Sequence, residues 1–131
     1  MPKVLVIDDS MTVRLQVTRA LRGAGFETVE ACDGIDALER IEQHPDVALA
    51  ICDVNMPRMS GLEFLEAVRH VAPEIPVVIL TTAGQTTVIR EAKALGAKAW
   101  MIKPSNAESI LETARRLTVA TPTAPAPNVT D

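Results

Sequence analysis

Short apolar runs alternate with amphipathic stretches along most of this chain of 131 residues. The runs are rich in Val, Ile, Leu and Ala, and they predict strands near residues 3–8, 27–31, 47–53, 76–81 and 98–102. Apolar residues at helical spacing predict helices near 10–23, 34–44, 61–72, 85–95 and 105–117. This regular alternation of strand and helix predicts an α/β fold with a mainly parallel sheet.

Sequence signals at the helix ends agree with these boundaries. Ser60–Glu63 and Ser105–Glu108 match the capping box, in which Ser and Glu side chains bind free amides at a helix start. Gly23, Gly25 and Gly96 follow predicted helices, where a left-handed residue is common. The local signals and the apolar pattern therefore predict the same elements.

The pattern divides the chain into one domain and a tail. Residues 1–117 carry the strands and helices, and they are enough for a single domain with its own core. From Thr118 the chain is rich in Pro, Thr and Ala without periodicity, which predicts a disordered tail over 118–131. Such a tail fits either a natural end or a linker to a further domain.

Charge and composition exclude several classes of partner. The net charge is −4 and no basic run is present, so nothing indicates a nucleic-acid surface. No apolar stretch approaches the roughly 18 residues of a membrane span, and the N-terminus lacks the pattern of a signal peptide. The two cysteines agree with a reducing compartment. We therefore expect a cytoplasmic protein without nucleic-acid or membrane partners.

Four predicted strands end at residues that suit phosphoryl chemistry. The first ends at the pair Asp8 and Asp9, and the others end at Asp53, Thr81 and Lys103. The carboxyl ends of parallel strands lie along one edge, where ligands bind, so we expect these side chains to meet. Each residue alone has an ordinary explanation as a helix cap, a solvated charge or a β-former. Four complementary strand ends together argue against coincidence.

Three carboxylates at one edge form a hard-oxygen site of the kind that Mg²⁺ prefers. A divalent ion and Lys103 would relieve the repulsion among the carboxylates and prepare the site for a phosphoryl group. Asp53 is the best candidate nucleophile, because carboxylates can form acyl phosphates. Lys103 and the Thr81 hydroxyl would then bind the phosphoryl oxygens.

Together these residues resemble the receiver domain of two-component response regulators. The matching runs are Val6–Ser10, Asp53–Pro57 with Gly61, Thr81–Ala83, Gly96–Ala97 and Trp100–Pro104. The resemblance covers residues 3 to about 117. It implies a flavodoxin-like (βα)5 three-layer sandwich whose parallel sheet has the strand order 2-1-3-4-5.

The resemblance also implies a role for each candidate residue. Asp53 would be the phosphoacceptor, and Thr81 and Lys103 would contact the phosphoryl group. The implied Mg²⁺ ligands are Asp8, Asp9, Asp53 and the backbone carbonyl of Asn55.

Trp100 matches the aromatic switch residue of this family. On phosphorylation Thr81 would move toward the phosphoryl group and Trp100 would rotate inward. The alternative for Trp100 is a partly buried packing residue. Around it, on the fourth helix and fifth strand, we expect Arg90, Lys93 and Lys98 to contribute to partner contact, the alternative being an ordinary solvated surface.

The implied protein is a response regulator and not a conventional enzyme, although it catalyses its own phosphorylation and dephosphorylation. Its donor would be a sensor histidine kinase, such as a CheA-like one, or acetyl phosphate, and its target a flagellar motor switch or another effector. The stand-alone chemotaxis (CheY-like) type fits best. The alternatives are a receiver from a larger regulator and a haloacid-dehalogenase-like phosphatase. The phosphatase normally has an Asp-x-Asp run, but here Asn55 stands at the second position.

Overall fold

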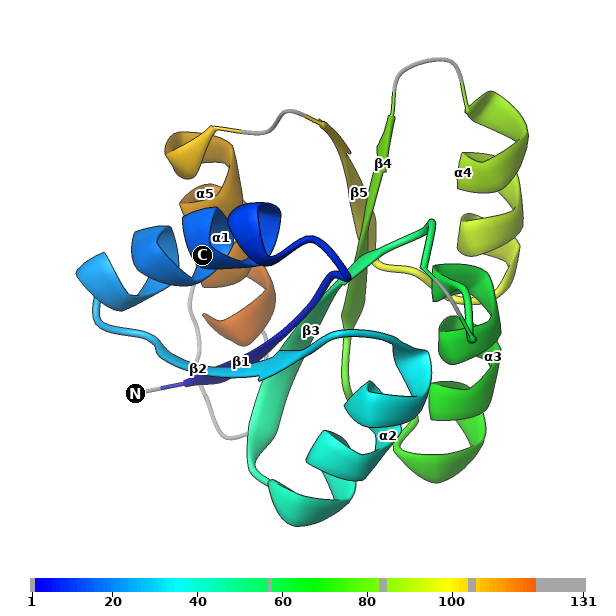
Figure 1. Ribbon diagram of the computed structural model, residues 1–131, viewed down its shortest axis with the longest axis horizontal. Helices are drawn as coiled ribbons and strands as arrows, with labels where there is room; N and C mark the ends of the chain where they lie inside the picture. The colour runs from blue at the N-terminus through cyan, green and yellow to red at the C-terminus, as the bar shows by residue number, and fades with distance from the viewer. Residues whose placement is uncertain (1, 57, 83–84, 104–105, 120–131) are drawn as a thin grey trace.

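Strands and helices alternate along the whole described chain (Figure 1). The computed structural model describes residues 2–56, 58–82, 85–103 and 106–119. The strands are β1 (Lys3–Ile7), β2 (Glu27–Ala31), β3 (Val47–Asp53), β4 (Val77–Thr82) and β5 (Ala99–Lys103). The helices are α1 (Met11–Gly23), α2 (Gly34–Gln43), α3 (Gly61–Val71), α4 (Thr86–Ala94) and α5 (Ala107–Val119). None of these described helices is long and apolar enough to cross a bilayer.

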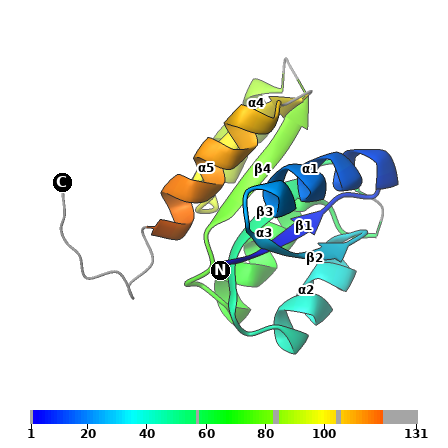
Figure 2. The ribbon, with the colours of Figure 1, turned by 90° about the vertical axis from the view of Figure 1, so that its left-hand side faces the viewer.

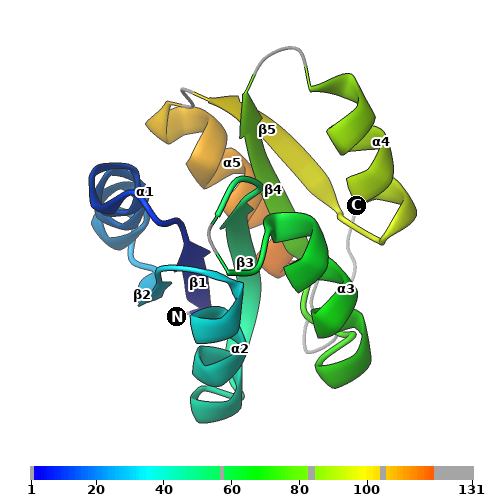
Figure 3. The same cartoon turned by 45° about the vertical axis from the view of Figure 1, so that its right-hand side comes forward.

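All five strands pair in parallel, in the order β2-β1-β3-β4-β5. Helices cover both faces of this sheet: α1 and α5 lie on one face, and α2, α3 and α4 lie on the other (Figure 3). Figure 2 looks toward the side that carries α1 and α5. The predicted three-layer α/β fold and its strand order are therefore confirmed.

The central strands bury side chains on both faces of the sheet. In β1, Leu5 and Ile7 join a core cluster with side chains of α2, α3 and α4. Val4 and Val6 point the other way and join a cluster with side chains of α1 and α5. Because strands buried on both faces need apolar residues at every position, they appear in the sequence as continuous apolar runs.

The predicted capping box at α3 is present. Ser60 Oγ accepts the Glu63 N–H at 3.2 Å, and Glu63 Oε1 accepts the Ser60 N–H at 2.9 Å. At α5 the predicted cap, Ser105, lies outside the described residues. There Asn106 Oδ1 accepts the Ser109 N–H at 2.8 Å, so an Asn cap starts the helix slightly later than predicted.

Two of the three glycines that follow predicted helices adopt the expected left-handed backbone. Gly25 has a φ of 98° and Gly96 a φ of 100°. Gly23 is instead the last residue of α1.

Helix α5 continues two residues beyond its predicted end at residue 117. Thr118 is buried in it, and its hydroxyl donates to the Ala114 carbonyl at 2.7 Å. This bond satisfies the buried hydroxyl inside the helix, so a residue that suggested the start of the tail extends the domain instead. The remaining part of the predicted tail, residues 120–131, lies outside the described residues.

Candidate functional site

The parallel sheet brings the predicted site residues to one edge. Asp8 directly follows β1, Asp53 ends β3, Thr81 lies near the end of β4 and Lys103 ends β5. Strand β3 lies between β1 and β4, and Asp53 is in register with Leu80, the residue before Thr81. The topology therefore places these side chains together although they are far apart in sequence.

Three carboxylates converge at this edge. One oxygen from each of Asp8, Asp9 and Asp53 lies within 4.8 Å of the other two. Asp8 and Asp53 are buried, with exposures of 1% and 4%, whereas Asp9 is exposed. Buried anions this close repel one another unless a cation lies nearby.

The environment of Asp8 leaves one of its oxygens available to such a cation. Asp8 Oδ1 accepts the Ser10 N–H at 2.9 Å, and Arg14 donates to the Asp8 backbone carbonyl at 2.6 Å. Asp8 Oδ2 is buried, and among the described residues nothing donates a hydrogen bond to it. This buried oxygen faces the Lys103 ammonium at 3.2 Å and lies beside two further carboxylates, so it can also serve as a ligand for a hard cation such as Mg²⁺.

Lys103 supplies the positive charge at the site. Its Nζ lies 3.0 Å from Asp53 Oδ1 and 3.2 Å from Asp8 Oδ2, so it forms an ion pair with each carboxylate. Burial would lower the pKa of Lys103, but the two carboxylates outweigh it and raise that pKa. Lys103 therefore carries its charge at neutral pH.

The surroundings of Asp53 disfavour the negative charge of its carboxylate. Burial raises its pKa and the charge of Asp8 adds to that rise, although Lys103 and the Asn55 N–H act in the opposite direction. A carboxylate with a raised pKa is more basic, and hence a better nucleophile, than one in water. The exposed Asn55 lies two residues after Asp53; a metal-binding role for its carbonyl stays a prediction.

Gly61 allows α3 to begin directly against the backbone of Asp53. The Gly61 N–H donates to the Val54 carbonyl at 3.0 Å. A Cβ at Gly61 would lie 2.5 Å from the Asp53 carbonyl oxygen and 2.8 Å from Val54 Cα. Both of these atoms belong to the backbone and cannot rotate away, so the position requires glycine.

Gly61→Ala is accordingly expected to lower the free energy of unfolding by about 1–3 kcal/mol, as overpacking does. Gly23→Ala is the matched control, because a Cβ there meets nothing within 4 Å. This control should be neutral, or stabilising by up to about 1 kcal/mol, since alanine favours a helix more than glycine does. Urea unfolding measures both, and equal effects of the two substitutions would contradict the close approach at Gly61.

An ion pair that the sequence did not reveal joins Arg58, shortly before α3, to Asp33 at the start of α2. Arg58 has a φ of 62°, a left-handed conformation that is uncommon for a residue other than glycine. Its Nε and Nη2 both lie 2.7 Å from Asp33 Oδ2. Asp33 is buried and caps α2, with Oδ1 accepting the Asp36 N–H at 2.8 Å. Asp33 before Gly34 could have indicated the cap, but no local signal indicates its arginine partner.

Arg58→Met is expected to destabilise the protein at pH 7 and to have a smaller effect at pH 3. Burial would raise the pKa of Asp33, but the Asp36 N–H and Arg58 outweigh it and hold that pKa below 3.8. The contribution of a carboxylate with a lowered pKa is present above its unfolded pKa and is lost as the pH falls. Urea unfolding at both pH values tests this, with Arg19→Met on the exposed side of α1 as control. An equal loss at both pH values would contradict it.

Thr81 and Trp100, the predicted switch pair, have different surroundings. Thr81 is fully buried, and its hydroxyl donates to the side-chain oxygen of Gln85. Trp100 is 39% exposed, and Lys93 Nζ from α4 lies 5.3 Å from the centre of its ring. Trp100 stands three residues before Lys103 in β5, so the two side chains point to opposite faces.

The three basic residues near Trp100 are all exposed: Arg90, Lys93 and Lys98, the last of which precedes β5. Their part in partner contact stays a prediction.

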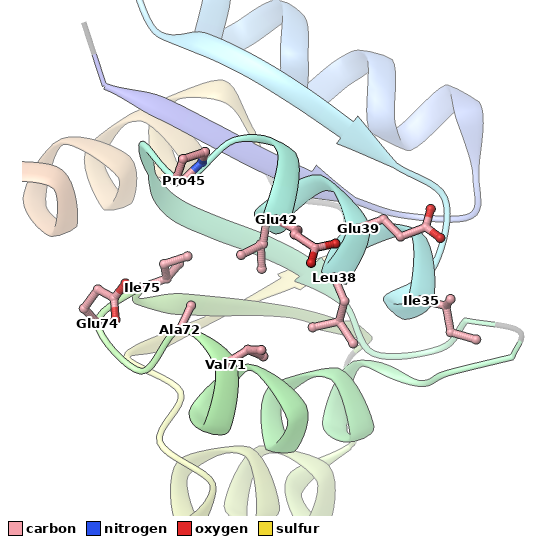
Figure 4. Close-up of a pocket in the computed structure, with 10 residues that line it drawn as sticks. Ile35, Leu38, Glu39, Glu42, Pro45, Val71, Ala72, Glu74 and Ile75 are labelled. Atoms are coloured by element: carbon pink, nitrogen blue, oxygen red, sulfur yellow. The ribbon is translucent and has the colours of Figure 1, made fainter.

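A hollow of about 520 Å³ between α2 and α3 lies away from these groups (Figure 4). Its floor is apolar, and its rim carries the glutamates Glu39, Glu42 and Glu74. Pro45 and Ile75 line it and precede β3 and β4, so it belongs mainly to the sheet edge opposite Asp53. It therefore has no part in the carboxylate site.

Comparison with known proteins finds one family. The family model described as the response regulator receiver domain matches residues 4–115. The chain is 36% identical over 112 residues to the chemotaxis protein CheY of Treponema pallidum, covering 84% of this chain and 78% of that protein. It is 30% identical over 115 residues to sporulation initiation phosphotransferase F of Bacillus subtilis, covering 87% and 91%.

Solved structures give the same result. The chain is similar to the chemotaxis protein CheY4 of Vibrio cholerae, with a TM-score of 0.84 and 40% identity, over 89% of this chain and 98% of that one. It is also similar to a chain of the CheX-CheY-BeF3-Mg complex from Borrelia burgdorferi. There the TM-score is 0.82 and the identity 25%, over 88% and 87% of the two chains.

Proposed function

Because this chain belongs to the CheY-type receiver domains of response regulators, we propose that Asp53 accepts a phosphoryl group. We further propose that this phosphorylation changes the binding of a partner protein. Receiver domains are two-component signalling proteins and not conventional enzymes. The observation that carries the proposal is the contact between buried Asp53 and Lys103, whose Nζ lies 3.0 Å from Asp53 Oδ1. A nucleophile and a cation that can stabilise the transferred group thus lie side by side.

In the proposed reaction an Asp53 carboxylate oxygen attacks the phosphorus of a phosphohistidine or of acetyl phosphate. A new O–P bond forms while the bond to the imidazole nitrogen or acetyl oxygen breaks, and the leaving group keeps the electron pair. The Lys103 ammonium and the Thr81 hydroxyl stabilise the charge on the phosphoryl oxygens. Later attack by water returns the carboxylate and releases inorganic phosphate, so the chain catalyses both steps on itself.

Mg²⁺ is the proposed cofactor, held by Asp8, Asp9, Asp53 and the backbone carbonyl of Asn55. The convergence of three carboxylate oxygens within 4.8 Å of one another supports this set. When bound, the ion neutralises the negative charge of the transferring phosphoryl group. A solved complex of a similar CheY is named as containing BeF3 and Mg.

The proposed output surface is formed by α4, β5 and α5. Trp100 lies on it and is 39% exposed, beside Lys93 of α4, so a change at Thr81 can reach this surface through β4 and its neighbour β5. The chemotaxis names of the relatives support a CheA-like sensor histidine kinase as donor. They also support a flagellar motor switch or another effector as target, and a cytoplasmic location.

The two alternative functions are not favoured. A haloacid-dehalogenase-like phosphatase would need a second carboxylate where Asn55 stands, and the comparisons match the receiver family instead. The stand-alone type is supported by the two relatives named above, of which the chain covers 78% and 91%.

Intact-mass measurement after incubation with acetyl phosphate and Mg²⁺ tests the proposal. We expect a gain of one phosphoryl group that is prevented by chelation of the metal. A folded wild-type protein that gains nothing would contradict the proposal. Sustained release of phosphate from several small phosphate esters would favour the phosphatase.

A further inference from the structure

Gln85 makes a set of contacts that the proposed reaction does not explain. It immediately precedes α4, at the N-cap position, yet its side chain makes no hydrogen bond to that helix. Its Oε1 turns back to the end of β4 and accepts from Thr81 Oγ1, from Thr82 N at 3.1 Å and from Thr82 Oγ1 at 2.8 Å. One side-chain oxygen thus ties the end of a strand to the start of a helix.

These contacts use the full hydrogen-bonding capacity of the Gln85 side-chain oxygen, which therefore does not cap the N-terminus of α4. A carbonyl oxygen has two lone pairs, and three donors share them here. Helix α4 has no acidic residue in its first turn, and its one fully buried residue is Ala92. The Gln85 side chain therefore adds a polar link between β4 and the first turn of α4 to the packing of Val88 against the core.

The Thr81 hydroxyl cannot serve Gln85 and a phosphoryl group at the same time. A hydroxyl carries a single proton and donates one strong hydrogen bond. A phosphoryl oxygen that accepts this proton must therefore displace the Gln85 oxygen.

We propose that Gln85 is a latch that holds the Thr81 hydroxyl and the start of α4 in the unphosphorylated conformation, and that a phosphoryl group on Asp53 opens it. This inference rests on the proposed function of Asp53. Phosphorylation replaces a neutral hydrogen-bond acceptor by a charged one, which Thr81 favours. Loss of the Thr81 hydrogen bond then weakens the link between β4 and the first turn of α4, which belongs to the output surface, while the two hydrogen bonds from Thr82 can remain. By linkage, the strength of the latch opposes the phosphorylated state.

Substitution of Gln85 by leucine tests the latch. Gln85→Leu keeps the size of the side chain and removes the acceptor, and Gln85 is only half-buried, so the fold should tolerate it. The probe is beryllofluoride, a phosphoryl mimic, titrated by calorimetry at saturating Mg²⁺. We expect about threefold to tenfold tighter binding than in the wild type, the range for the loss of one competing neutral hydrogen bond. The affinity for Mg²⁺ alone should not change.

A matched control and a double-mutant cycle separate the latch from a general effect. Gln16→Leu makes the same change at an exposed position of α1, and it should leave the affinity for beryllofluoride as in the wild type. In a Thr81→Val background, which lacks the hydroxyl, Gln85→Leu should change the affinity less than twofold, because the two residues act on one proton. Gln85→Ala repeats the measurement with a smaller side chain.

The outcomes separate the latch from the proposed function. Unchanged or weaker beryllofluoride binding by Gln85→Leu, or equal tightening in the Thr81→Val background, would overturn the latch and leave the function of Asp53 intact. A wild-type protein that does not bind beryllofluoride with Mg²⁺ would overturn the function itself.

Discussion

Asp53→Asn is expected to reduce phosphoryl uptake from acetyl phosphate below detection while leaving the domain folded. The carboxamide has nearly the shape of the carboxylate, but it is not nucleophilic and cannot form the acyl phosphate. Because burial raises the pKa of Asp53, its charge is disfavoured in the folded state, and its removal should not lower the urea midpoint. Intact mass measured over time gives the uptake, and urea unfolding verifies the fold.

Asp46→Asn provides the matched control for this result. Asp46 lies just before β3, at the other end of the same strand, and pairs with Lys3 at 3.0 Å. The same loss of charge there should leave phosphoryl uptake at the wild-type rate. If Asp53→Asn instead took up phosphoryl groups at a rate near that of the wild type, the acceptor would be another residue.

Lys103→Met is expected to have two effects in opposite directions. Loss of the ammonium near the transferring oxygens should slow phosphorylation by about 10² to 10³, as does the loss of one preorganised donor in other active sites. The affinity for Mg²⁺ should rise, because the substitution removes a positive charge 3.2 Å from the buried Asp8 Oδ2. Methionine keeps the length of the side chain, so packing changes little.

Lys98→Met is the control for Lys103→Met. Lys98 is exposed and precedes β5, at the opposite end of the strand that Lys103 ends. The loss of its charge should change neither the rate nor the Mg²⁺ affinity. Phosphorylation kinetics and calorimetric titration of Mg²⁺ supply the two readouts. A slower reaction of Lys103→Met without tighter metal binding would mean that Lys103 does not share the carboxylate site.

The strands could be predicted from the sequence because burial on both faces of the sheet requires an apolar side chain at nearly every position. Strands β1, β3 and β4 are buried on both faces, so their apolar runs were visible, and each predicted strand lies within one residue of the observed one. The site could be predicted for the same reason: a charged residue at the end of such a run stands out, and parallel topology brings those ends together.

What the sequence concealed depends on side-chain conformation and on contacts between distant residues. Gln85 before a helix resembles an ordinary boundary residue, and nothing local shows that its oxygen turns back to Thr81. The pairing of Arg58 with Asp33 joins two loops 25 positions apart and needs a left-handed arginine, which no propensity predicts. Thr118 suggested the start of the tail, because its bond to the Ala114 carbonyl forms only within the helix.

Function, like the fold, could be predicted from the sequence only in part. The type of chemistry follows from the residue types at the strand ends, since carboxylates, a hydroxyl and an ammonium at one edge suit few reactions. The control of that chemistry depends on individual hydrogen bonds, such as the one that occupies the Thr81 hydroxyl.

The most direct measurement of the central claim identifies the residue that carries the phosphoryl group. Wild-type protein is incubated with acetyl phosphate and Mg²⁺ and treated with borohydride, which reduces an acyl phosphate of aspartate to homoserine. Peptide mass spectrometry then locates the converted residue. We predict homoserine at position 53, and none there when the metal is chelated before acetyl phosphate is added. Homoserine at another aspartate, or an unmodified Asp53 in protein that has gained a phosphoryl group, would contradict the assignment of Asp53 as the phosphoacceptor.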